Sequence, residues 1–214
     1  MTISQYRLID YPAGRRVTDF WQLSHDPVQQ PATGEVKLRV DWISVDPGMS
    51  GWITDKRSYM PPVKPGEVMR AFGVGEVIES RCDSLPVGDV VTGFTGVSTH
   101  VVLPARHLRK VDTALAPAPL YLSALGMTGY TAYFGMTDIG RPQPGQTVVV
   151  SSAAGAVGSI ASQIARLEGA RVVGIAGGPE KKAFLLGELN LEAAIDHRNE
   201  DITTALRMNA PDGI

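Results

Sequence analysis

The chain has 214 residues, of which 43% are hydrophobic and 20% are charged. This is the composition of an ordinary globular protein, and it argues against intrinsic disorder. Lysine and arginine number 20 and aspartate and glutamate 22, which gives a formal net charge of −2. No basic surplus exists to neutralise a phosphate backbone, so we expect no nucleic-acid partner.

Cysteine usage and hydropathy indicate the kind of compartment. The single cysteine, Cys82, can neither form an intrachain disulfide nor supply a cysteine-rich zinc site. The N-terminus lacks the charged start and apolar run of a signal peptide. The most apolar stretch, residues 148–165, is interrupted by serines and a glutamine, so it does not read as a membrane span. The sequence therefore predicts a cytoplasmic protein without a membrane partner.

Residues 1–120 form the first predicted domain. Eleven of the 15 prolines lie in residues 1–119, between short runs of β-type residues. Residues 35–43 and 75–80 alternate polar and apolar side chains with a period of two, as half-buried strands do. Two more short runs follow at residues 87–93 and 99–103. Several short strands with frequent turn signals predict a small β-barrel or sandwich.

Residues 121–214 form the second predicted domain, which begins with a helical stretch over 121–137 that Gly126 and Gly129 should bend or break. Strands and helices then alternate. The expected strands are 146–151, 171–176 and 192–196, and the expected helices are 156–167, 179–189 and 199–208. This alternation predicts a doubly wound α/β fold. A complete dinucleotide-binding sheet has about six strands, so we expect an N-terminal part of a longer protein; a stand-alone three-stranded unit is the alternative.

The strongest local signal is the glycine-containing segment 151–158, which follows a buried strand and opens a helix. That context is the one required of a dinucleotide-binding fingerprint. Ala153 takes the place of the first glycine, Gly155 of the second and Gly158 of the third. Gly155 would let the backbone approach a pyrophosphate, and Gly158 would let the helix pack closely on the sheet. Plain packing between a helix and a strand is the alternative interpretation.

The end of the second predicted strand favours NADP over NAD. An NAD site has a carboxylate about 20 residues beyond the glycines, but this strand ends in Gly177 and Gly178. The glycines leave room, and Lys181 and Lys182 supply charge, for a 2′-phosphate. Alternatively, the lysines are simply solvated on a helix face, and Glu180 reaches a ribose.

Three segments, residues 125–135, 138–140 and 144–145, together with the glycine loop, resemble zinc-independent medium-chain reductases. The group is the one that contains leukotriene 12-hydroxydehydrogenase/prostaglandin reductase, plant double-bond reductases and bacterial curcumin reductase. Residues 45–51, Tyr59, 61–63 and 73–77 extend the resemblance into the first half. It implies a GroES-like β domain, a Rossmann domain, and NADPH-dependent reduction of the carbon–carbon double bond of α,β-unsaturated ketones and aldehydes.

The resemblance also implies roles for particular residues. The loop residues would cradle the pyrophosphate, a glycine and two basic residues would form the 2′-phosphate site, two helix residues would lie near the nicotinamide, and a short segment would line the substrate cleft. The loop residues are Ala153, Gly155, Ala156, Val157 and Gly158, and the 2′-phosphate site consists of Gly177, Lys181 and His197. The helix residues are Met127 and Thr131, and the cleft segment is Pro47, Gly48 and Met49.

Two departures from related sequences bear on the chemistry. Zinc-dependent relatives carry Gly-His-Glu where this chain has Arg70, Ala71 and Phe72, so no zinc site is expected. Family members commonly read Asp-Pro-Tyr-Met-Arg at residues 46–50, and their tyrosine has an active-site role. Gly48 stands at that position and offers no phenol, so no catalytic residue is assigned from the sequence.

The expected partner is a small-molecule enone, with a quinone as the nearest alternative substrate. A different class of function, a non-catalytic NADP-binding or interaction protein, is also compatible with Gly48. Turnover separates these hypotheses, since only an enzyme oxidises NADPH when an enone is added. Family members often dimerise through the last strand of the Rossmann sheet, which predicts a homodimer if a longer chain exists.

Overall fold

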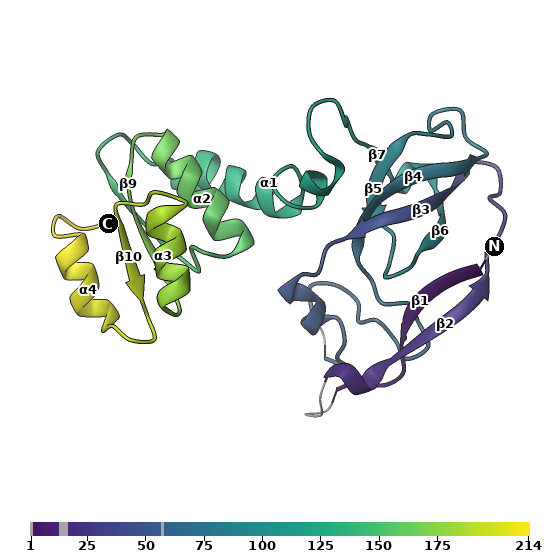
Figure 1. Ribbon diagram of the computed structural model, residues 1–214, viewed down its shortest axis with the longest axis horizontal. Coiled ribbons are helices and arrows are strands. Elements are labelled where there is room, and N and C mark those ends of the chain that lie inside the picture. The colour runs from purple at the N-terminus through teal and green to yellow at the C-terminus, as the bar shows by residue number, and fades with distance from the viewer. Residues whose placement is uncertain (1, 13–16, 57) are drawn as a thin grey trace. The chain divides into compact units, whose positions relative to one another are not determined.

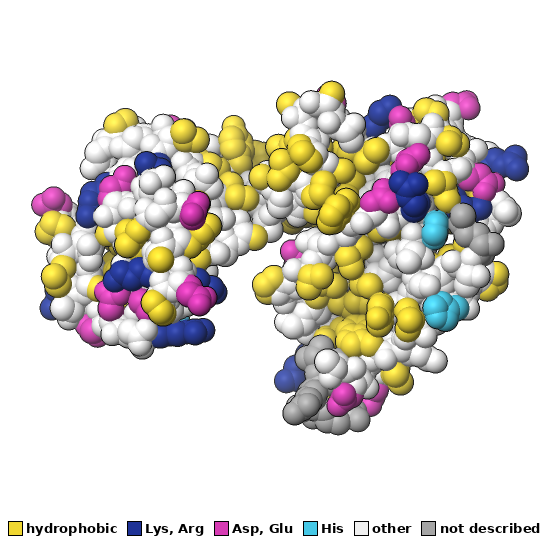
Figure 2. All heavy atoms as spheres, in the orientation of Figure 1, with side chains coloured by type: hydrophobic (Ala, Val, Ile, Leu, Met, Phe, Trp, Pro, Cys, Tyr) yellow, Lys and Arg dark blue, Asp and Glu magenta, His cyan; other side chains and the backbone are white. Residues whose placement is uncertain are grey.

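The computed structural model describes residues 2–12, 17–56 and 58–214. The chain divides into two compact units, Met1–Leu122 and Ser123–Ile214, which are described separately here (Figure 1). On the face of the molecule seen in Figure 2, acidic and basic side chains lie interspersed on both units, in keeping with the small net charge. No helix among the described residues is both long and apolar enough to cross a membrane.

The first unit is built on an antiparallel sheet with the strand order β6-β3-β4-β5-β7. Its strands are β3 (Glu35–Ile43), β4 (Phe72–Ser80), β5 (Val90–Phe94), β6 (His100–Pro104) and β7 (Arg109–Lys110). Side chains from several of these strands form a core that includes Val36, Leu38, Val77 and Val91, each with no exposed surface. They lie in the predicted strands 35–43, 75–80 and 87–93, so the predicted β domain is confirmed.

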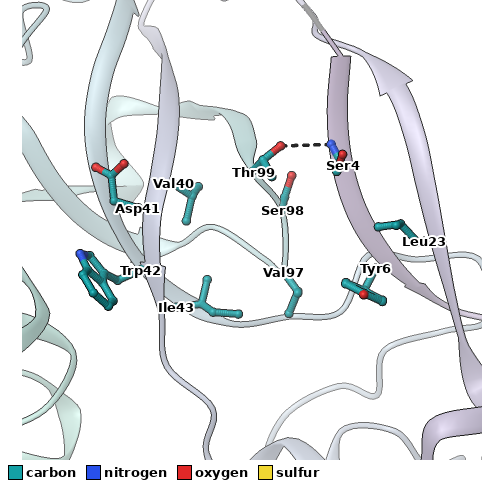
Figure 3. A pocket seen from close by; sticks show the side chains of 10 residues that line it. All are labelled: Ser4, Tyr6, Leu23, Val40, Asp41, Trp42, Ile43, Val97, Ser98 and Thr99. Atoms are coloured by element: carbon teal, nitrogen blue, oxygen red, sulfur yellow. Dashed lines mark hydrogen bonds between the residues drawn. The ribbon is translucent and has the colours of Figure 1, made fainter.

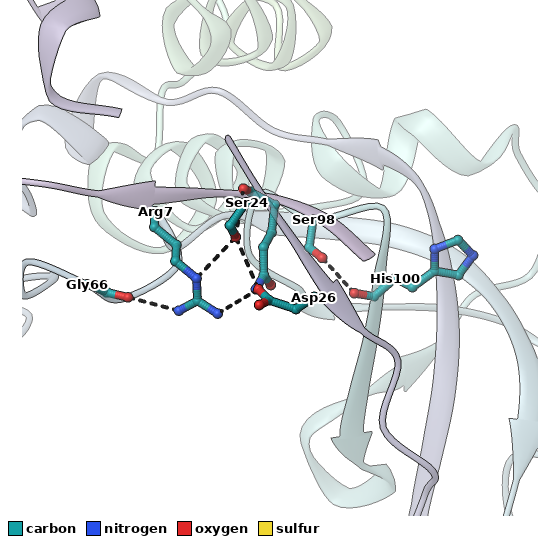
Figure 4. Close-up of polar contacts among 7 residues, drawn as sticks. Arg7, Ser24, Asp26, Gly66, Ser98 and His100 are labelled. Atoms are coloured by element: carbon teal, nitrogen blue, oxygen red, sulfur yellow. Dashed lines mark hydrogen bonds and ion pairs between the residues drawn. The ribbon is translucent and has the colours of Figure 1, made fainter. Parts of the chain in front are cut away.

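A separate two-stranded ribbon, β1 (Thr2–Leu8) paired with β2 (Trp21–Pro27), completes the first unit. The sequence analysis predicted neither strand. Polar bonds fix the ribbon (Figure 4): Arg7 contacts Asp26 across the ribbon at 3.1 Å and donates to the carbonyl of Gly66 at 2.8 Å. The hydroxyl of Ser24 also donates to Asp26. Hydrogen bonds from Arg7, Gln5 and Ser24 hold the pKa of Asp26 below its ordinary value.

Short 3₁₀ helices lie between strands of the first unit: η1 (Val17–Phe20), η2 (Pro47–Gly51) and η3 (Ala105–His107). Another, η4 (Ala118–Leu122), follows the last strand of this unit. Beside the ribbon, a second apolar cluster contains Leu8, Phe20, Trp52 and Val63. Trp52 directly follows η2 and is 5% exposed. The η2 segment, which carries the expected substrate-cleft residues, is therefore anchored at its C-terminal end by a buried indole.

The second unit holds a parallel sheet with the order β10-β9-β8. Its strands are β8 (Thr147–Ser151), β9 (Arg171–Ala176) and β10 (Ala193–Asp196), and its helices are α1 (Met127–Phe134), α2 (Ala156–Leu167), α3 (Pro179–Gly187) and α4 (Ile202–Asn209). Val172 packs with Ala165 of α2 and Leu185 of α3, whereas the adjacent Val173 packs with Ala205 of α4. Because neighbouring strand residues face opposite sides, helices cover both faces. The predicted doubly wound α/β fold is confirmed.

Two helix starts differ from the sequence expectation. The stretch 121–137 is not one helix: α1 begins after Gly126 and passes into a π-helical segment, η5 (Gly135–Gly140). Gly129 lies inside α1 without breaking it, because its missing side chain lets Ala124 approach; a Cβ atom would stand 1.8 Å from that carbonyl oxygen. The last helix begins at Ile202 rather than 199, since Asp201 caps it by accepting from the Thr204 amide at 2.8 Å.

Candidate functional site

The nucleotide loop connects β8 to α2 through residues 152–155 and turns tightly. Ser152 has a left-handed backbone, with φ of 50°, and its carbonyl accepts the Gly155 amide at 2.8 Å. A Cβ atom on Gly158 would lie 2.3 Å from the same carbonyl oxygen. Only glycine therefore allows the first turn of α2 to pack against this loop. The packing role predicted for Gly158 is thus what the geometry requires.

Ala153 has a different environment from its neighbours in the loop. Its side chain is fully buried in the apolar cluster between the sheet and the helices. The residues after it begin α2, for which Gly155 is the N-cap. The free amides at this end of the helix and the helix dipole favour an anion. Ala156 and Val157 occupy this first turn, and Val157 is 37% exposed.

The register of the sheet brings a second segment to the same edge. Asp196 of β10 pairs with Ala176 of β9 in parallel register. The two residues that follow, Gly177 and His197, therefore leave adjacent strands at the same edge of the sheet. The His197 amide donates to the carbonyl of Ala176 at 3.0 Å, which ties the two strand ends together.

A hollow of about 140 Å³ lies at this edge. Residues from the nucleotide loop, the end of β9, the start of α3 and the loop after β10 line it: Ser152, Ala154, Gly155, Ala176, Gly177, Lys181, His197 and Arg198. Of the predicted cofactor residues, the structure brings together Gly155, Gly177, Lys181 and His197. Arg198 was missed by the sequence analysis, because only the path of the loop after β10 brings its guanidinium over Gly177.

Gly177 forms the floor beneath two basic side chains. A Cβ atom built on it would lie 2.8 Å from Nε of Arg198 and 2.8 Å from Nε2 of His197. Any side chain at position 177 would therefore displace these groups. None of the described residues that line the hollow is acidic, and the Arg198 guanidinium, the Lys181 ammonium and the His197 imidazole can donate hydrogen bonds to an anion such as a phosphate.

The two neighbouring lysines of α3 have different partners. Lys182 donates to Oε1 of Glu200 at 2.5 Å, and this bond holds the pKa of Glu200 below its ordinary value. Lys181 is exposed and lines the hollow. The charge pattern offered both lysines, and the family resemblance selected Lys181; of the two, Lys181 is the one that lines the hollow.

The other predicted cofactor residues, Met127 and Thr131, lie on α1 and do not line the hollow. Met127 begins the helix and is 59% exposed. The Thr131 hydroxyl donates to the Met127 carbonyl at 2.8 Å, one turn earlier in the same helix. The structure thus gives these two residues a common surface on α1, without a described contact to the nucleotide loop.

The predicted substrate-cleft residues Pro47, Gly48 and Met49 form the first turn of η2 in the first unit. Pro47 is exposed, whereas Met49 is partly buried and packs against the apolar cluster that contains Trp52. A Cβ atom on Gly48 would lie 3.0 Å from the hydroxyl oxygen of Tyr59. This oxygen accepts the indole N–H of Trp52 at 3.2 Å. A phenol therefore stands beside Gly48, although it comes from another part of the chain.

The positions that align with a zinc ligand motif are occupied by packing residues. Arg70 stacks over the indole of Trp52 with 5.4 Å to the ring centroid, Ala71 is buried, and Phe72 stacks on Phe94 with centroids 3.9 Å apart. Among residues 2–12, 17–56 and 58–214, no three His, Cys, Asp or Glu side chains are grouped so as to hold a metal ion.

A larger hollow, of about 240 Å³, lies in the first unit between β1 and β3 (Figure 3). Its floor is apolar, with Val40, Ile43 and Val97, and the Ser4 amide donates to the Thr99 hydroxyl at its rim at 3.1 Å. Asp41 is the only charged side chain among the ten described residues that line it. It has no grouping of cations or nucleophiles comparable to the hollow in the second unit.

Comparisons with known proteins agree with this geometry. Residues 4–111 match the family model described as the N-terminal domain of oxidoreductase. A putative NADP-dependent oxidoreductase, YfmJ of Bacillus subtilis (strain 168), is 45% identical over 217 residues, which cover 100% of this chain and 64% of the relative. The NADPH-dependent curcumin reductase of Escherichia coli (strain K12) is 38% identical, with 97% of this chain and 60% of the relative covered.

Solved structures show the same relationship. CurA from Vibrio vulnificus in complex with NADPH superposes with a TM-score of 0.91 at 36% identity, covering 99% of this chain and 63% of that one. An Escherichia coli quinone oxidoreductase complexed with NADPH, at 21% identity and a TM-score of 0.72, covers 97% of this chain and 62% of its own and shares the fold. The chain thus spans 60–64% of the length of the relatives named here.

Proposed function

This chain belongs to the zinc-independent medium-chain dehydrogenase/reductases, in the group of the curcumin and prostaglandin reductases, and we propose that its protein is an NADPH-dependent alkenal/one oxidoreductase. Such an enzyme reduces the carbon–carbon double bond of α,β-unsaturated ketones and aldehydes. Within it, residues 1–120 form the GroES-like domain and residues 121–214 the N-terminal half of the NADP-binding Rossmann domain.

The observation that carries the proposal is the glycine at position 177, which lets the side chains of His197 and Arg198 lie directly over the end of β9. A bound adenosine with a 2′-phosphate needs both space at the end of the second strand and positive charge around it. The hollow of about 140 Å³ supplies the space, and the missing side chain of Gly177 lets Arg198 and His197 come within 2.8 Å of the point where a Cβ atom would stand. Lys181 adds a charge that no described acidic group pairs with. The residues present therefore fit NADPH better than NADH.

Each predicted cofactor residue has a role in this proposal. Gly155, Ala156, Val157 and Gly158 hold the pyrophosphate at the start of α2, with Ala153 supporting the loop from the core. Lys181, His197 and Arg198 surround the 2′-phosphate above Gly177. Met127 and Thr131 of α1 flank the nicotinamide. NADPH, when bound, supplies the hydride that adds to the β-carbon of the enone.

The substrate side of the proposal rests on η2. Pro47, Gly48 and Met49 line the cleft, and Tyr59 supplies the hydrogen-bond donor for the enolate oxygen. Because the phenol oxygen already accepts a bond from Trp52, its own proton is free for an external acceptor. A donor placed where charge develops stabilises the transition state more than the ground state.

The proposal extends to partners and location. The substrate is a small molecule, the enzyme acts in the cytoplasm without a nucleic-acid or membrane partner, and the whole protein forms a homodimer. The net charge of −2 supports the part of the proposal that concerns nucleic acid, since no basic surplus exists to neutralise a phosphate backbone.

The test is a turnover assay on the whole protein, with NADPH consumption followed by its near-ultraviolet absorbance. We expect oxidation with a small linear enone and none with the corresponding saturated ketone. Consumption with quinones alone would instead identify a quinone reductase. Saturable NADPH binding without any turnover would identify a non-catalytic NADP-binding protein.

A further inference from the structure

Asp196, the last residue of β10, carries a carboxylate that is buried but not paired with a cation. The residue is 4% exposed, and none of the ion pairs found among the described residues involves it. Isolated buried charges are costly, so such a group persists only when hydrogen bonds satisfy it. Packing of the strand therefore does not account for the buried charge of Asp196, and hydrogen-bond donors around the carboxylate have to satisfy it.

Three N–H groups satisfy this carboxylate. Its Oδ1 accepts the amide of Gly178 at 2.7 Å and the amide of Arg198 at 3.1 Å. Its Oδ2 accepts the side-chain amide of Asn199 at 2.7 Å. The bond from Gly178, followed by the one from Asn199, holds the pKa of Asp196 below its ordinary value. The group is thus a charged, acceptor-only centre at neutral pH.

These bonds connect the two loops that carry the basic side chains of the hollow. Gly178 follows Gly177 and is the N-cap of α3, which carries Lys181. Arg198 and its neighbour His197 lie on the loop after β10. A single oxygen of Asp196 therefore fixes the backbone of one loop relative to the backbone of the other.

Glu200 reinforces the same junction. Its Oε1 accepts the backbone amide of Asp196 at 2.9 Å and the ammonium of Lys182 at 2.5 Å. The second lysine of α3 is thereby tied to the loop after β10. The two carboxylates thus act on the junction in different ways: Glu200 binds a side chain of α3, whereas Asp196 binds the backbone at the start of that helix.

We propose that Asp196 is a positioning residue for the 2′-phosphate of the cofactor, holding the floor at Gly177–Gly178 and the cations of residues 197–198 in the arrangement that distinguishes NADPH from NADH. The inference rests on the proposed function. Its physical basis is preorganisation: cations fixed before binding lose less conformational freedom when the phosphate arrives. Asp196 itself does not touch the cofactor and acts only through its neighbours.

The test exchanges two functional groups. Asp196→Asn removes the charge and one of the two acceptor oxygens, so that the Asn199 amide has to rotate to keep a bond, which weakens the junction. The double variant Asp196→Asn with Asn199→Asp restores a donor–acceptor pair and moves the charge to an exposed position. We measure the affinities of the whole protein for 2′,5′-ADP and for 5′-AMP by calorimetry. We expect the single variant to lose about tenfold in 2′,5′-ADP affinity and less than about twofold in 5′-AMP affinity, and the double variant to recover most of the loss.

Asp201→Asn is the matched control. It removes a nearby carboxylate that caps α4 through the Thr204 amide, and it leaves the three bonds of Asp196 in place. We expect lower thermal stability without a selective loss of 2′,5′-ADP. If Asp196→Asn fails to fold, two other variants test the inference by the ratio of 2′,5′-ADP affinity to 5′-AMP affinity. They are the double variant and Asn199→Ala, which removes only one of the three donors.

Two results would overturn the inference: equal losses for both ligands in the folded Asp196 or Asn199 variants, or no recovery in the folded double variant. The failure of the proposed function is distinguishable, because then the unaltered protein itself would not prefer 2′,5′-ADP to 5′-AMP. In that case Asp196 would be a structural carboxylate alone, and its variants would differ only in stability.

Discussion

The hydroxyl oxygen of Tyr59 lies 3.0 Å from the point that a Cβ atom on Gly48 would occupy. The tyrosine is 78% exposed, and Trp52 orients its oxygen by an indole hydrogen bond of 3.2 Å. The phenol is therefore both held and accessible. In this chain a tyrosine eleven residues away stands beside the position where related sequences carry their own.

Replacing Tyr59 by phenylalanine should lower turnover. The change removes the hydroxyl but keeps the ring, and losing a single donor of this kind costs roughly 10²-fold in kcat. We expect that loss with a small linear enone and an unchanged affinity for NADPH, measured by steady-state kinetics and by fluorescence titration. Tyr6→Phe, on β1, is the control and should leave kcat unchanged. A wild-type kcat for Tyr59→Phe would remove the phenol from the mechanism.

A tyrosine introduced at Gly48 has to compete with Tyr59 for space. From the sequence alone, the single change Gly48→Tyr would be expected to raise kcat if the cleft has room. Since the new Cβ atom would already lie 3.0 Å from the Tyr59 oxygen, we expect little or no gain from the single variant. The double variant Gly48→Tyr with Tyr59→Phe has one phenol and more room, and it should recover most of the kcat lost in Tyr59→Phe. Additive losses in the double variant would contradict this.

The neighbouring lysines of α3 should respond differently to alanine. Lys181 lines the hollow, so Lys181→Ala should weaken NADPH binding by about tenfold and leave NADH binding nearly unchanged. Lys182 is bonded to Glu200, so Lys182→Ala should have the smaller effect on NADPH. Titration of both variants with both cofactors gives the comparison. Equal effects of the two substitutions would argue against the assignment of Lys181.

A substitution at Gly177 should change the binding of the cofactor with little effect on the stability of the fold. The nearest atoms to an added Cβ are the ends of the Arg198 and His197 side chains, which can move without disturbing the core. Gly177→Ala should therefore fold with nearly the melting temperature of the unaltered protein, yet bind NADPH several-fold more weakly. Gly177→Asp should go further and prefer NADH, because a carboxylate repels the phosphate and accepts the ribose hydroxyls. Unchanged cofactor preference in Gly177→Asp would place the phosphate elsewhere.

The carboxylates around the last helix predict how stability depends on pH. Bonds from the backbone and side chain of Thr204 lower the pKa of Asp201 below its usual value of 3.8. A carboxyl group with a lower pKa in the folded than in the unfolded state stabilises the fold above the unfolded value, and this stabilisation disappears as the pH falls through the folded value. Urea unfolding from about pH 7 to about pH 3 should show the advantage over Asp201→Asn narrowing with acidification. Asp212→Asn serves as the control, and a constant difference across the series would contradict the prediction.

The second unit was predictable because its signals are local. Continuous apolar strands such as residues 147–151, and glycines next to a helix start, depend on neighbours in the sequence. The ribbon of the first unit was not predictable in this way. Arg7, Ser24 and Asp26 bond to one another and to partners outside this set, such as the Gly66 carbonyl, and these bonds form only when the two strands are paired.

The site was predictable to a similar degree. Gly155, Gly177, Lys181 and His197 follow from spacing and resemblance, and the structure brings them to one hollow. Arg198 and the bonds of Asp196 depend on how the loop after β10 folds back toward Gly178, a geometry that no short-range pattern encodes. The proximity of Tyr59 to Gly48 likewise joins two positions eleven residues apart, and no short-range pattern encodes it.

The buried methyl group of Ala153 has a counterpart in the neighbouring strand. A Cβ atom on Gly174 of β9 would lie 3.0 Å from the Cβ of Ala153, and 2.9 Å from the side chains of Leu185 and Leu191. The cluster therefore has room for one methyl group at this point, and that methyl group belongs to Ala153 of the loop, whereas position 174 of the strand has none. A descendant with glycine at 153 would have a void that alanine at 174 could fill in part, whereas alanine at both positions would overfill the cluster. The side-chain volumes at positions 153 and 174 are therefore coupled, and a substitution at either position changes which side chains fit at the other.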